Sequence, residues 1–570
     1  MRSIILLWLT VSVWLFALPP DIAHFLNQSK LPGKDVSIYI KELGTDRVVA
    51  SLNAETTRQP ASVIKVATAY GALLKLGFDY RWPTEFYLNG YLRSGKLEGD
   101  LVIKGYGDPS LSSGDLPDIV AQIRQSGIQQ INGDVIIDRS YFDVGDEDSA
   151  HFDNYPYSAY NAMPDAMMFN ERTTTVGITP HNRSVYKEIA DPSYKVVNKV
   201  KFVDRSCRGK YAWAGSKVEM QSPLPQLILQ GELSKHCKER KVCMIVSKPY
   251  NAFYYALKEA LEDEGITVSG KMRLSGVPAG AKLIFTHYSE PLEAIVSETL
   301  KESNNLYARH LLLLTGAKIY GAPATVEKGR KAVTNLLRTQ HALPEGEFFM
   351  DNGSGLSRRS KMSARMLSAV YESAYRILGE RWMETLSIGG KDGTIKKRYR
   401  YKPAQNRSWM KTGTLKYVKN IGGYVKNRAG TYYSVVILVN TRRGTFRGAA
   451  LQDSIINWLA QTKKAPYESG SKTASAAPQD TPAAETKQPS PSSQQKKLSS
   501  GDYYIQIASV TKRPDSYYLS KLEKAGLRYT VVHEERYKVL IGGYPSRESA
   551  QNALPKIREK FNKGAFIVAR

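Results

Sequence analysis

Two residues three positions apart, Ser62 and Lys65, have the types needed for a nucleophile and its base. A serine hydroxyl is a poor nucleophile until a base takes its proton, and a lysine amine can be that base where burial and nearby cations lower its pKa. Residues 66–76 predict a helix, on which positions three apart share a face. Near the helix start, Ser62 would lie in a positive field that favours a developing oxyanion. Alone this Ser-x-x-Lys pattern is a weak signal, because it arises often by chance. The alternative interpretation is a surface lysine on a helix.

Two later motifs strengthen this interpretation. The first, Ser303-x-Asn305, precedes an apolar helical run. The Ser303 hydroxyl could relay a proton to a leaving amine, and the Asn305 side chain could hold a substrate amide. Lys411-Thr-Gly precedes two strand-like runs, and a strand edge of this kind offers a cation to a substrate carboxylate and backbone groups to an extended peptide. Gly413 would allow the substrate to approach closely. Each motif is common, but the ordered set of three in helix and strand contexts is not.

The flanking patterns predict the elements that must position these motifs. Residues 36–41 and 46–51 alternate as two strands of a hairpin that leads to the helix near Ser62. Residues 292–315 are strongly helical, with Pro291 suited to a helix start. Residues 421–426 and 432–440 read as two strands separated by a turn. Helices and strands therefore alternate in an α/β (α+β) domain.

The middle of the chain has a different texture. Residues 86–279 contain many short strands and turns, such as 99–104 and 133–138. We therefore expect a mostly-β module inserted into a discontinuous catalytic domain made of residues 19–85 and 280–462.

Length and charge set broader bounds. A chain of 570 residues should form two to four domains. Its 80 Lys+Arg against 54 Asp+Glu give a net charge of +26, which suits an acidic partner, although a basic solvated surface would also account for it. No nucleic-acid-binding motif is present, so we expect no nucleic-acid partner.

The N-terminus predicts export. Arg2 is followed by a short apolar run, residues 4–18, of the length of a signal-peptide core and short for a membrane span. We assign residues 1–18 as a signal peptide; if it stays uncleaved, residues 4–18 would anchor the protein in the membrane. The three cysteines, Cys207, Cys237 and Cys243, lack zinc-site spacing and fit either one disulfide or plain buried thiols. We expect neither a metal nor a cofactor.

The C-terminal part begins with a linker. Residues 463–500 are rich in Ser, Ala, Pro, Gln and Lys and cannot bury a core, so we expect a disordered segment spanning roughly 35 Å. Residues 501–570 regain structure: strands are predicted at 502–509, 529–533, 537–545 and 566–568, with helices at 516–525 and 546–561. This is a βαββαβ order.

The three motifs, in this order, are typical of penicillin-binding proteins and serine β-lactamases. Over residues 30–460 the chain resembles the penicillin-binding protein 4-like family of D-alanyl-D-alanine carboxypeptidases. Besides the motifs, the resemblance rests on Gly107-Asp-Pro-Ser-Leu111, Gly353-Ser-Gly-Leu-Ser-Arg358 and Gly390-Lys-Asp-Gly-Thr394. Two departures are Asn352, where many relatives have Asp, and Asp165, where a small residue is usual.

The resemblance implies roles for individual residues. Ser62 would be the acylated nucleophile and Lys65 its base, with Ser303 and Asn305 shuttling the proton and positioning substrate. Lys411 would complete the polar network and bind a terminal carboxylate. The further implied set comprises the oxyanion-hole N–H groups of Ser62 and Thr414, the substrate-binding residues Thr412 and Gly413, and Arg358, for which an exposed loop arginine is the alternative.

The last segment resembles the sporulation-related repeat (SPOR) domain, a peptidoglycan-binding module, through Tyr504-Ile-Gln-Ile-Ala508 and Val539-Leu-Ile-Gly-Gly-Tyr-Pro545. The resemblances together imply a serine D-alanyl-D-alanine carboxypeptidase or endopeptidase of the periplasm or cell envelope, enriched at the division septum. Its partners would be peptidoglycan stem peptides and glycan strands, with β-lactams as inhibitors. The alternatives are a β-lactamase and a catalytically idle peptidoglycan-binding wall protein.

Overall fold

The computed structural model describes residues 18–145, 152–220 and 224–463, and in the C-terminal part residues 503–510, 522, 527, 529–533, 537–560 and 566–569. The chain divides into two units, residues 1–472 and 473–570, which are described separately. The predicted signal peptide, apart from Leu18, and the predicted linker, apart from Lys463, lie outside the described residues.

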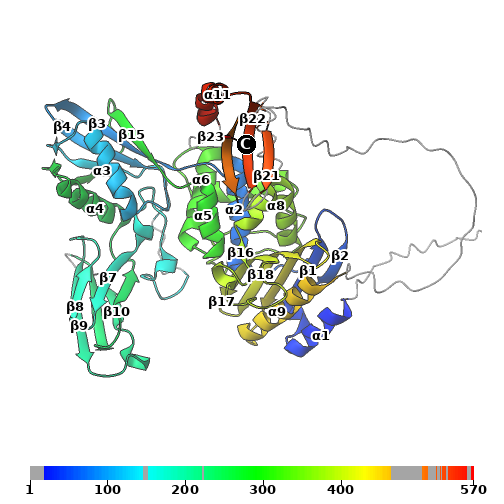
Figure 1. The fold of residues 1–570 in the computed structure, drawn as a ribbon. Coiled ribbons are helices and arrows are strands. Elements are labelled where there is room, and N and C mark those ends of the chain that lie inside the picture. Colours follow the sequence, from blue (N-terminus) through cyan, green and yellow to red (C-terminus); the bar gives the residue numbers. More distant parts are fainter. Residues whose placement is uncertain are drawn as a thin grey trace, which may run out of the picture. The chain divides into compact units, whose positions relative to one another are not determined.

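A six-stranded antiparallel sheet forms the centre of the first unit, in the order β16-β17-β18-β19-β1-β2 (Figure 1). The N-terminal hairpin pairs with a strand from the far end of the unit, since Val36 lies opposite Val439 and Ile38 opposite Ile437. The strands are β1 (Val36–Glu42), β2 (Val48–Leu52), β16 (Ser387–Ile388), β17 (Ser408–Leu415), β18 (Val418–Lys426) and β19 (Tyr432–Asn440). The predicted hairpin and the two late strands are confirmed.

Helices cover both faces of this sheet. On one face α1 and α9 pack over strand residues such as Ile38 and Ile437. On the other, α8 packs on β1 and β19, with a layer of α2, α5, α6 and α7 beyond it. The helices are α1 (Pro20–Ser29), α2 (Lys65–Leu76), α5 (Leu292–Lys301), α6 (Asn305–Tyr320), α7 (Val326–Thr339), α8 (Ala364–Glu384) and α9 (Thr445–Gln461). From Leu306 to Ala317 every residue of α6 is buried, as expected for a helix inside the core.

The continuous helix predicted over residues 292–315 is wrong, because α5 ends at Lys301 and α6 starts at Asn305. Ser303 lies between them with a left-handed φ of 64°. Asn304 is the N-cap of α6, and its side chain accepts a hydrogen bond from the backbone N–H of Tyr307. The break fixes the start of α6 at the Ser-x-Asn motif.

The insertion has two lobes (Figure 1). The larger lobe is a seven-stranded sheet with helices α3 and α4. Its sheet runs from Pro83 to Tyr288, beyond the predicted boundaries of 86 and 279 on both sides, because β15 pairs with β3. The elements are β3 (Pro83–Arg93), β4 (Lys96–Gly105), α3 (Leu116–Gln125), β5 (Gln130–Ile131), β6 (Val135–Asp138), α4 (Pro249–Asp263), β13 (Thr267–Val268), β14 (Met272–Leu274) and β15 (Lys282–Tyr288).

The smaller lobe consists of two three-stranded sheets, in the orders β12-β7-β8 and β10-β11-β9. Its strands are β7 (Thr174–Thr179), β8 (Ser184–Lys187), β9 (Lys195–Val203), β10 (Gly215–Glu219), β11 (Gln226–Ser234) and β12 (Arg240–Met244). Cys207 and Cys237 form a disulfide here, and Cys243 is a free, exposed thiol. Of the two interpretations of the cysteines, the structure therefore shows one disulfide with one cysteine left over.

The second unit contains a four-stranded antiparallel sheet in the order β21-β22-β20-β23. The described elements are β20 (Tyr503–Val510), β21 (Tyr529–His533), β22 (Tyr537–Tyr544), α11 (Arg547–Lys560) and β23 (Phe566–Ala569). Ile505, Ile541 and Ile557 are buried in its core. The first predicted helix, residues 516–525, lies outside the described residues except for Leu522.

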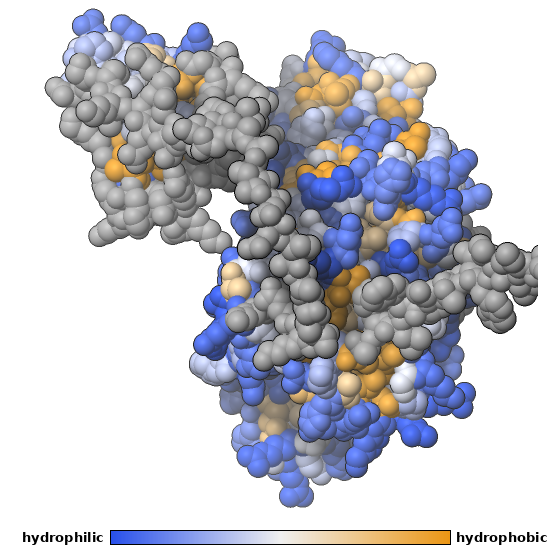
Figure 2. Space-filling view, turned by 90° about the vertical axis from the view of Figure 1, so that its right-hand side faces the viewer, coloured by the Kyte–Doolittle hydropathy of each residue, from blue (hydrophilic) through white to orange (hydrophobic). Residues whose placement is uncertain are grey.

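The surface is largely polar. Figure 2 shows hydrophilic side chains over most of the coloured part of the visible face, with small, separate hydrophobic patches. Within the described ranges, no helix combines the length and the apolar character needed to cross a bilayer.

Candidate active site

Ser62 lies in a single 3-10 turn, Ala61–Ile64, directly before α2. Ala61 adopts a left-handed backbone, with φ of 51°, which turns the chain sharply into the helix. The turn is packed from outside by Gly355, where a Cβ atom would lie 2.0 Å from the carbonyl oxygen of Ala61. A glycine is therefore required at position 355 to keep the neighbouring loop against the turn that holds Ser62.

Lys65 is the centre of the site's hydrogen-bond network. Its Nζ lies 2.9 Å from Ser62 Oγ, 2.7 Å from Asn305 Oδ1 and 2.5 Å from the carbonyl oxygen of Ser354. The side chain is completely buried. Burial, followed by repulsion from Lys411 and Arg309, lowers the pKa of Lys65 well below its ordinary value. A larger fraction of neutral amine is thus in contact with the hydroxyl whose proton it must take.

Strand β17 brings Lys411 and Gly413 to the same place. Lys411 is completely buried, and its Nζ has no hydrogen-bond partner within the described residues. Burial lowers the pKa of Lys411 to about 7, opposed by the nearby carboxylate of Glu302. At Gly413 a Cβ atom would lie 2.9 Å from Pro60 O and 3.1 Å from Ser62 N. The strand therefore runs directly beside the backbone N–H of Ser62.

The two threonines of the motif face more open surroundings. Thr412 is half-buried, and its hydroxyl donates to that of Thr394 at 2.9 Å. Thr414 is exposed, and its hydroxyl accepts a hydrogen bond from Lys419 at 3.2 Å. Thr412 and Thr414 flank Gly413 on β17, where an extended peptide could add to the strand.

Asn305 and Ser303 approach from the start of α6. Asn305 accepts from Lys65 through Oδ1 and donates through Nδ2 to the carbonyl oxygen of Tyr160, at 3.1 Å. The Ser303 hydroxyl makes no hydrogen bond to another described residue of the site. The structure thus joins Ser62, Lys65 and Asn305 by hydrogen bonds, whereas Ser303 is linked to them only through its place two residues before Asn305 in the sequence.

Arg358 is exposed and lies apart from this network. Its guanidinium stacks on the ring of Phe152 at 5.1 Å. It lines a cavity of about 350 Å³ together with Gln59, Lys416 and Tyr417. Gln59 lies three residues before Ser62, so this cavity is close to the nucleophile in sequence.

Two contributors were missed at the sequence level. The carbonyl oxygen of Ser354 is a Lys65 acceptor, and a backbone acceptor has no signal in the sequence of its own. Arg309 is buried one turn after Asn305 and donates to the carbonyl oxygen of Ala162, while its charge lowers the pKa of Lys65. An arginine inside an apolar helix was the available signal. His310 beside it is completely buried, and its Nδ1 lies 2.8 Å from the carbonyl oxygen of Gly107.

Both departures from the family pattern have structural roles. Asn352 Oδ1 accepts from the backbone N–H and the hydroxyl of Ser354, at 3.1 and 2.8 Å, and so holds the loop that contacts Lys65. Asp165 is buried, forms an ion pair with Arg139 and accepts from the backbone N–H of Met167.

Comparison with known proteins gives a consistent result. The model of the D-Ala-D-Ala carboxypeptidase 3 (S13) family matches residues 18–462, and the SPOR domain model matches residues 499–569. The D-alanyl-D-alanine carboxypeptidase DacB of Haemophilus influenzae is 28% identical over 419 residues, covering 72% of this chain and 86% of that protein. A D-alanyl-D-alanine carboxypeptidase of Actinomadura sp. strain R39 is 28% identical over 460 residues, covering 77% and 84%. The crystal structure of penicillin binding protein 4 from H. influenzae superposes with a TM-score of 0.65 at 25% identity, covering 77% of this chain and 99% of that one.

Proposed function

The chain belongs to the D-Ala-D-Ala carboxypeptidase 3 (S13) family and carries a C-terminal SPOR domain, and from this premise we propose that Ser62 is its acylated nucleophile. The protein is a serine-type D-alanyl-D-alanine carboxypeptidase acting on peptidoglycan stem peptides. The observation that carries the assignment is the buried amine of Lys65, which contacts Ser62, Asn305 and the Ser354 carbonyl oxygen at once.

We propose the following course for the reaction. Neutral Lys65 takes the proton of Ser62 as its oxygen attacks the carbonyl carbon of the D-alanyl-D-alanine bond. The backbone N–H groups of Ser62 and Thr414 stabilise the oxyanion. The proton passes by way of Ser303 to the amine of the leaving D-alanine. Water then attacks the acyl-enzyme, which releases the shortened stem peptide and restores Ser62.

Substrate binding uses strand β17 and its surroundings. Lys411 and Thr412 bind the terminal carboxylate, and Gly413 lets the stem peptide lie against the strand. The side-chain amide of Asn305 orients the donor peptide. Arg358, which lines the neighbouring cavity, contacts the donor side chain.

The same site would also cut a D-alanyl cross-link between two stems, which is an endopeptidase activity. The SPOR domain would hold the enzyme on glycan strands and raise its local concentration there through the linker. We place the protein in the periplasm, enriched at the division septum, with residues 4–18 as a membrane anchor if the signal stays uncleaved.

Labelling with a fluorescent penicillin tests the proposal. We expect a lasting covalent band on the full-length exported protein that disappears in Ser62→Ala and persists in Ser126→Ala, a matched change at the end of α3. D-alanine release from a stem pentapeptide, compared with cleavage of a cross-linked dimer, then ranks the two activities. Rapid drug turnover would indicate a β-lactamase instead. A wild-type protein that neither takes the label nor hydrolyses the drug would leave only wall binding by residues 501–570.

A further inference from the structure

The insertion contains a second pocket, separate from the Ser62 site. Its volume is about 580 Å³, in the range of ligand sites. It lies between the two lobes and reaches Tyr307 on α6 of the catalytic domain. Its charged lining consists of Glu171, Glu188 and Asp191, and no Lys, Arg or His belongs to the described lining. The chain as a whole has a net charge of +26, so the acidic lining sets this pocket apart from the rest of the protein.

Asp191 is the feature that points to a ligand. It is only 3% exposed and lines the pocket. One carboxylate oxygen, Oδ1, accepts from the backbone N–H of Ser193 at 2.8 Å, whereas Oδ2 is buried without a hydrogen-bond partner in the described structure. An unpaired buried carboxylate oxygen is costly to a fold. A donor bound in the pocket would remove that cost.

The nearest lysines are occupied elsewhere. Lys187 Nζ donates to the backbone carbonyl oxygens of Asp191 and Tyr194 and stacks on the Tyr194 ring at 3.9 Å. Lys241 is 56% exposed and forms an ion pair with Glu188. Neither amine forms a hydrogen bond to Asp191 Oδ2, so in the described structure this oxygen has no donor.

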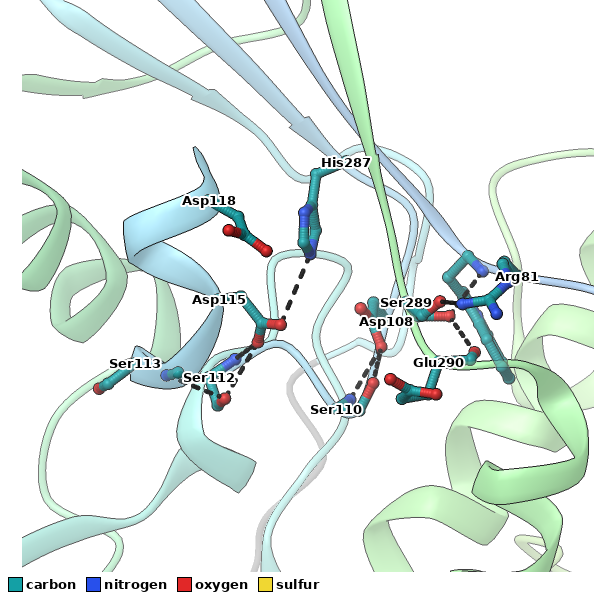
Figure 3. Close-up of polar contacts among 12 residues, drawn as sticks. Arg81, Asp108, Ser110, Ser112, Ser113, Asp115, Asp118, His287, Ser289 and Glu290 are labelled. Carbon is teal, nitrogen blue, oxygen red and sulfur yellow. Dashed lines mark hydrogen bonds and ion pairs between the residues drawn. The ribbon is translucent and has the colours of Figure 1, made fainter. Parts of the chain in front are cut away.

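Hydroxyl groups also line the pocket. Figure 3 shows Ser110, Ser112 and Ser113 on the loop before α3. Asp108 accepts from the backbone N–H and the hydroxyl of Ser110, and Asp115 does the same for Ser112. These hydrogen bonds hold the loop in its conformation. Farther back, His287 Nε2 lies 3.7 Å from the Asp115 carboxylate.

The pocket is connected to the catalytic motif. Glu171 accepts a hydrogen bond from Asn304 Nδ2 at 3.2 Å, and Asn304 is the middle residue of the Ser-x-Asn motif. Residues 170–172 all have left-handed backbones, with φ of 44°, 53° and 59°. Such strain in residues other than glycine persists where the surroundings impose it, and it is common at functional sites. A ligand in the pocket would lie one contact away from the motif that positions substrate.

We infer that this pocket is a second ligand site, which binds the primary ammonium group of a wall peptide with Asp191 Oδ2 as its terminal acceptor. The positive charge of the ligand follows from the pocket itself, while the choice of a wall peptide rests on the proposed function. The carboxylates of Glu171 and Asp191, together with that of the Lys241-paired Glu188, disfavour phosphate or carboxylate ligands here. The surrounding hydroxyls can pair with the amide groups of a peptide backbone.

The experiment uses the full-length exported protein after acylation of Ser62 by penicillin, which blocks the catalytic site and is verified by mass. The probe is the N-terminally acetylated tetrapeptide L-Ala-D-Glu-L-Lys-D-Ala, whose lysine amine is free, and the comparison is the same peptide with that amine acetylated. Titration calorimetry measures both affinities. We expect the peptide with the acetylated amine to bind about tenfold or more weakly than the peptide with the free amine.

Two variants locate the binding. Asp191→Asn keeps an acceptor for Ser193 but removes the charge, and it should weaken the free-amine peptide about tenfold or more. Asp204→Asn makes the same change in an exposed ion pair of the same lobe and should leave affinity unchanged. Thermal melting and penicillin labelling confirm that both variants are folded.

The outcomes separate the two proposals. Failure of Ser62 to acylate contradicts the proposed function alone. An acylated enzyme that binds no free-amine peptide, that binds both peptides equally, or that keeps full affinity in Asp191→Asn overturns the second site. Selective binding that depends on Asp191 and survives acylation supports it.

Discussion

The catalytic domain and the smaller lobe of the insertion use lysine in opposite ways. In the catalytic domain Lys65 and Lys411 are completely buried. In the smaller lobe, lysine side chains such as Lys210, Lys217 and Lys241 are 71%, 61% and 56% exposed, and each pairs with a glutamate. Burial penalises the charged form, so the buried amines have lowered pKa values. Hydrogen bonds to Glu232 and Glu188 instead raise the pKa values of the exposed Lys210 and Lys241.

The difference shows what turns a lysine into a base. Burying an ionisable group costs free energy that a fold does not recover from the group itself. An exposed ion pair gains little, because water screens it. In the catalytic domain two lysines, Lys65 and Lys411, are buried in the site of Ser62 despite this cost. Their burial lowers their pKa values, and this allows Lys65 to act as a base. Changes to the buried lysines should therefore alter activity strongly, and changes to the exposed ones should not.

The largest effect is expected for Lys65→Met. Methionine has a similar length without an amine, so Ser62 loses its base while the core remains filled. The second-order rate of acylation by penicillin should fall about 10²- to 10⁴-fold. Stopped-flow measurement with a reporter β-lactam gives the rate, and the melting temperature shows that the variant is folded. A folded variant that acylates at the wild-type rate would mean that Lys65 is not the base.

Lys411→Gln should have a smaller effect with a distinct pH signature. Loss of a charged partner for the substrate carboxylate should slow acylation about 10- to 100-fold at neutral pH. The Lys411 charge also lowers the pKa of Lys65, so its removal raises that pKa. More Lys65 is then protonated at a given pH, and the acid limb of the rate profile moves to higher pH.

Measuring acylation from pH 5 to 10 separates these effects, with Lys402→Gln as an exposed-lysine control. An unshifted acid limb in Lys411→Gln would show that the two buried amines do not interact. A shifted limb in the control would mean that surface charge alone sets the profile.

Gly413→Ala tests the close approach between β17 and the nucleophile turn. The new Cβ atom would lie 2.9 Å from Pro60 O and 3.1 Å from Ser62 N, both backbone atoms, so the strand must shift away. Because misplacement by a fraction of an ångström weakens catalysis, we expect acylation to fall about tenfold. Gly33→Ala is the control, since its Cβ meets nothing within 4 Å. Equal rates in the two variants would contradict the tight approach.

The fold and much of the site could be predicted, because their signals are local. Alternation of apolar residues predicted β1, β18 and β19, and the Ser-x-x-Lys spacing predicted contact between Ser62 and Lys65. The break at Ser303 was missed because the apolar pattern continues through it, and a left-handed residue other than glycine gives no sequence signal.

Other features depend on contacts between distant segments. The Ser354 carbonyl reaches Lys65 across 289 positions, and any residue supplies a carbonyl. The second pocket is formed by five separate parts of the chain: residues 110–113, 170–175 and 188–194, together with Ala252 and Tyr307. Asp191 became informative only through its burial, which depends on how the lobes pack.

The smallest effect should come from Lys217→Ala in the smaller lobe. Lys217 pairs with Glu219 at 2.7 Å, but the pair is solvated and two residues apart on one strand, so the charges are close even without a bond. We expect the melting temperature to change by no more than about one degree and acylation to stay unchanged. Differential scanning calorimetry at low and high salt measures this, because a pair that mattered would be weakened by screening. A large salt-dependent loss of stability would show that exposed lysines stabilise the lobe. The exposed and buried lysines would then differ in their role in catalysis but not in whether they contribute to stability.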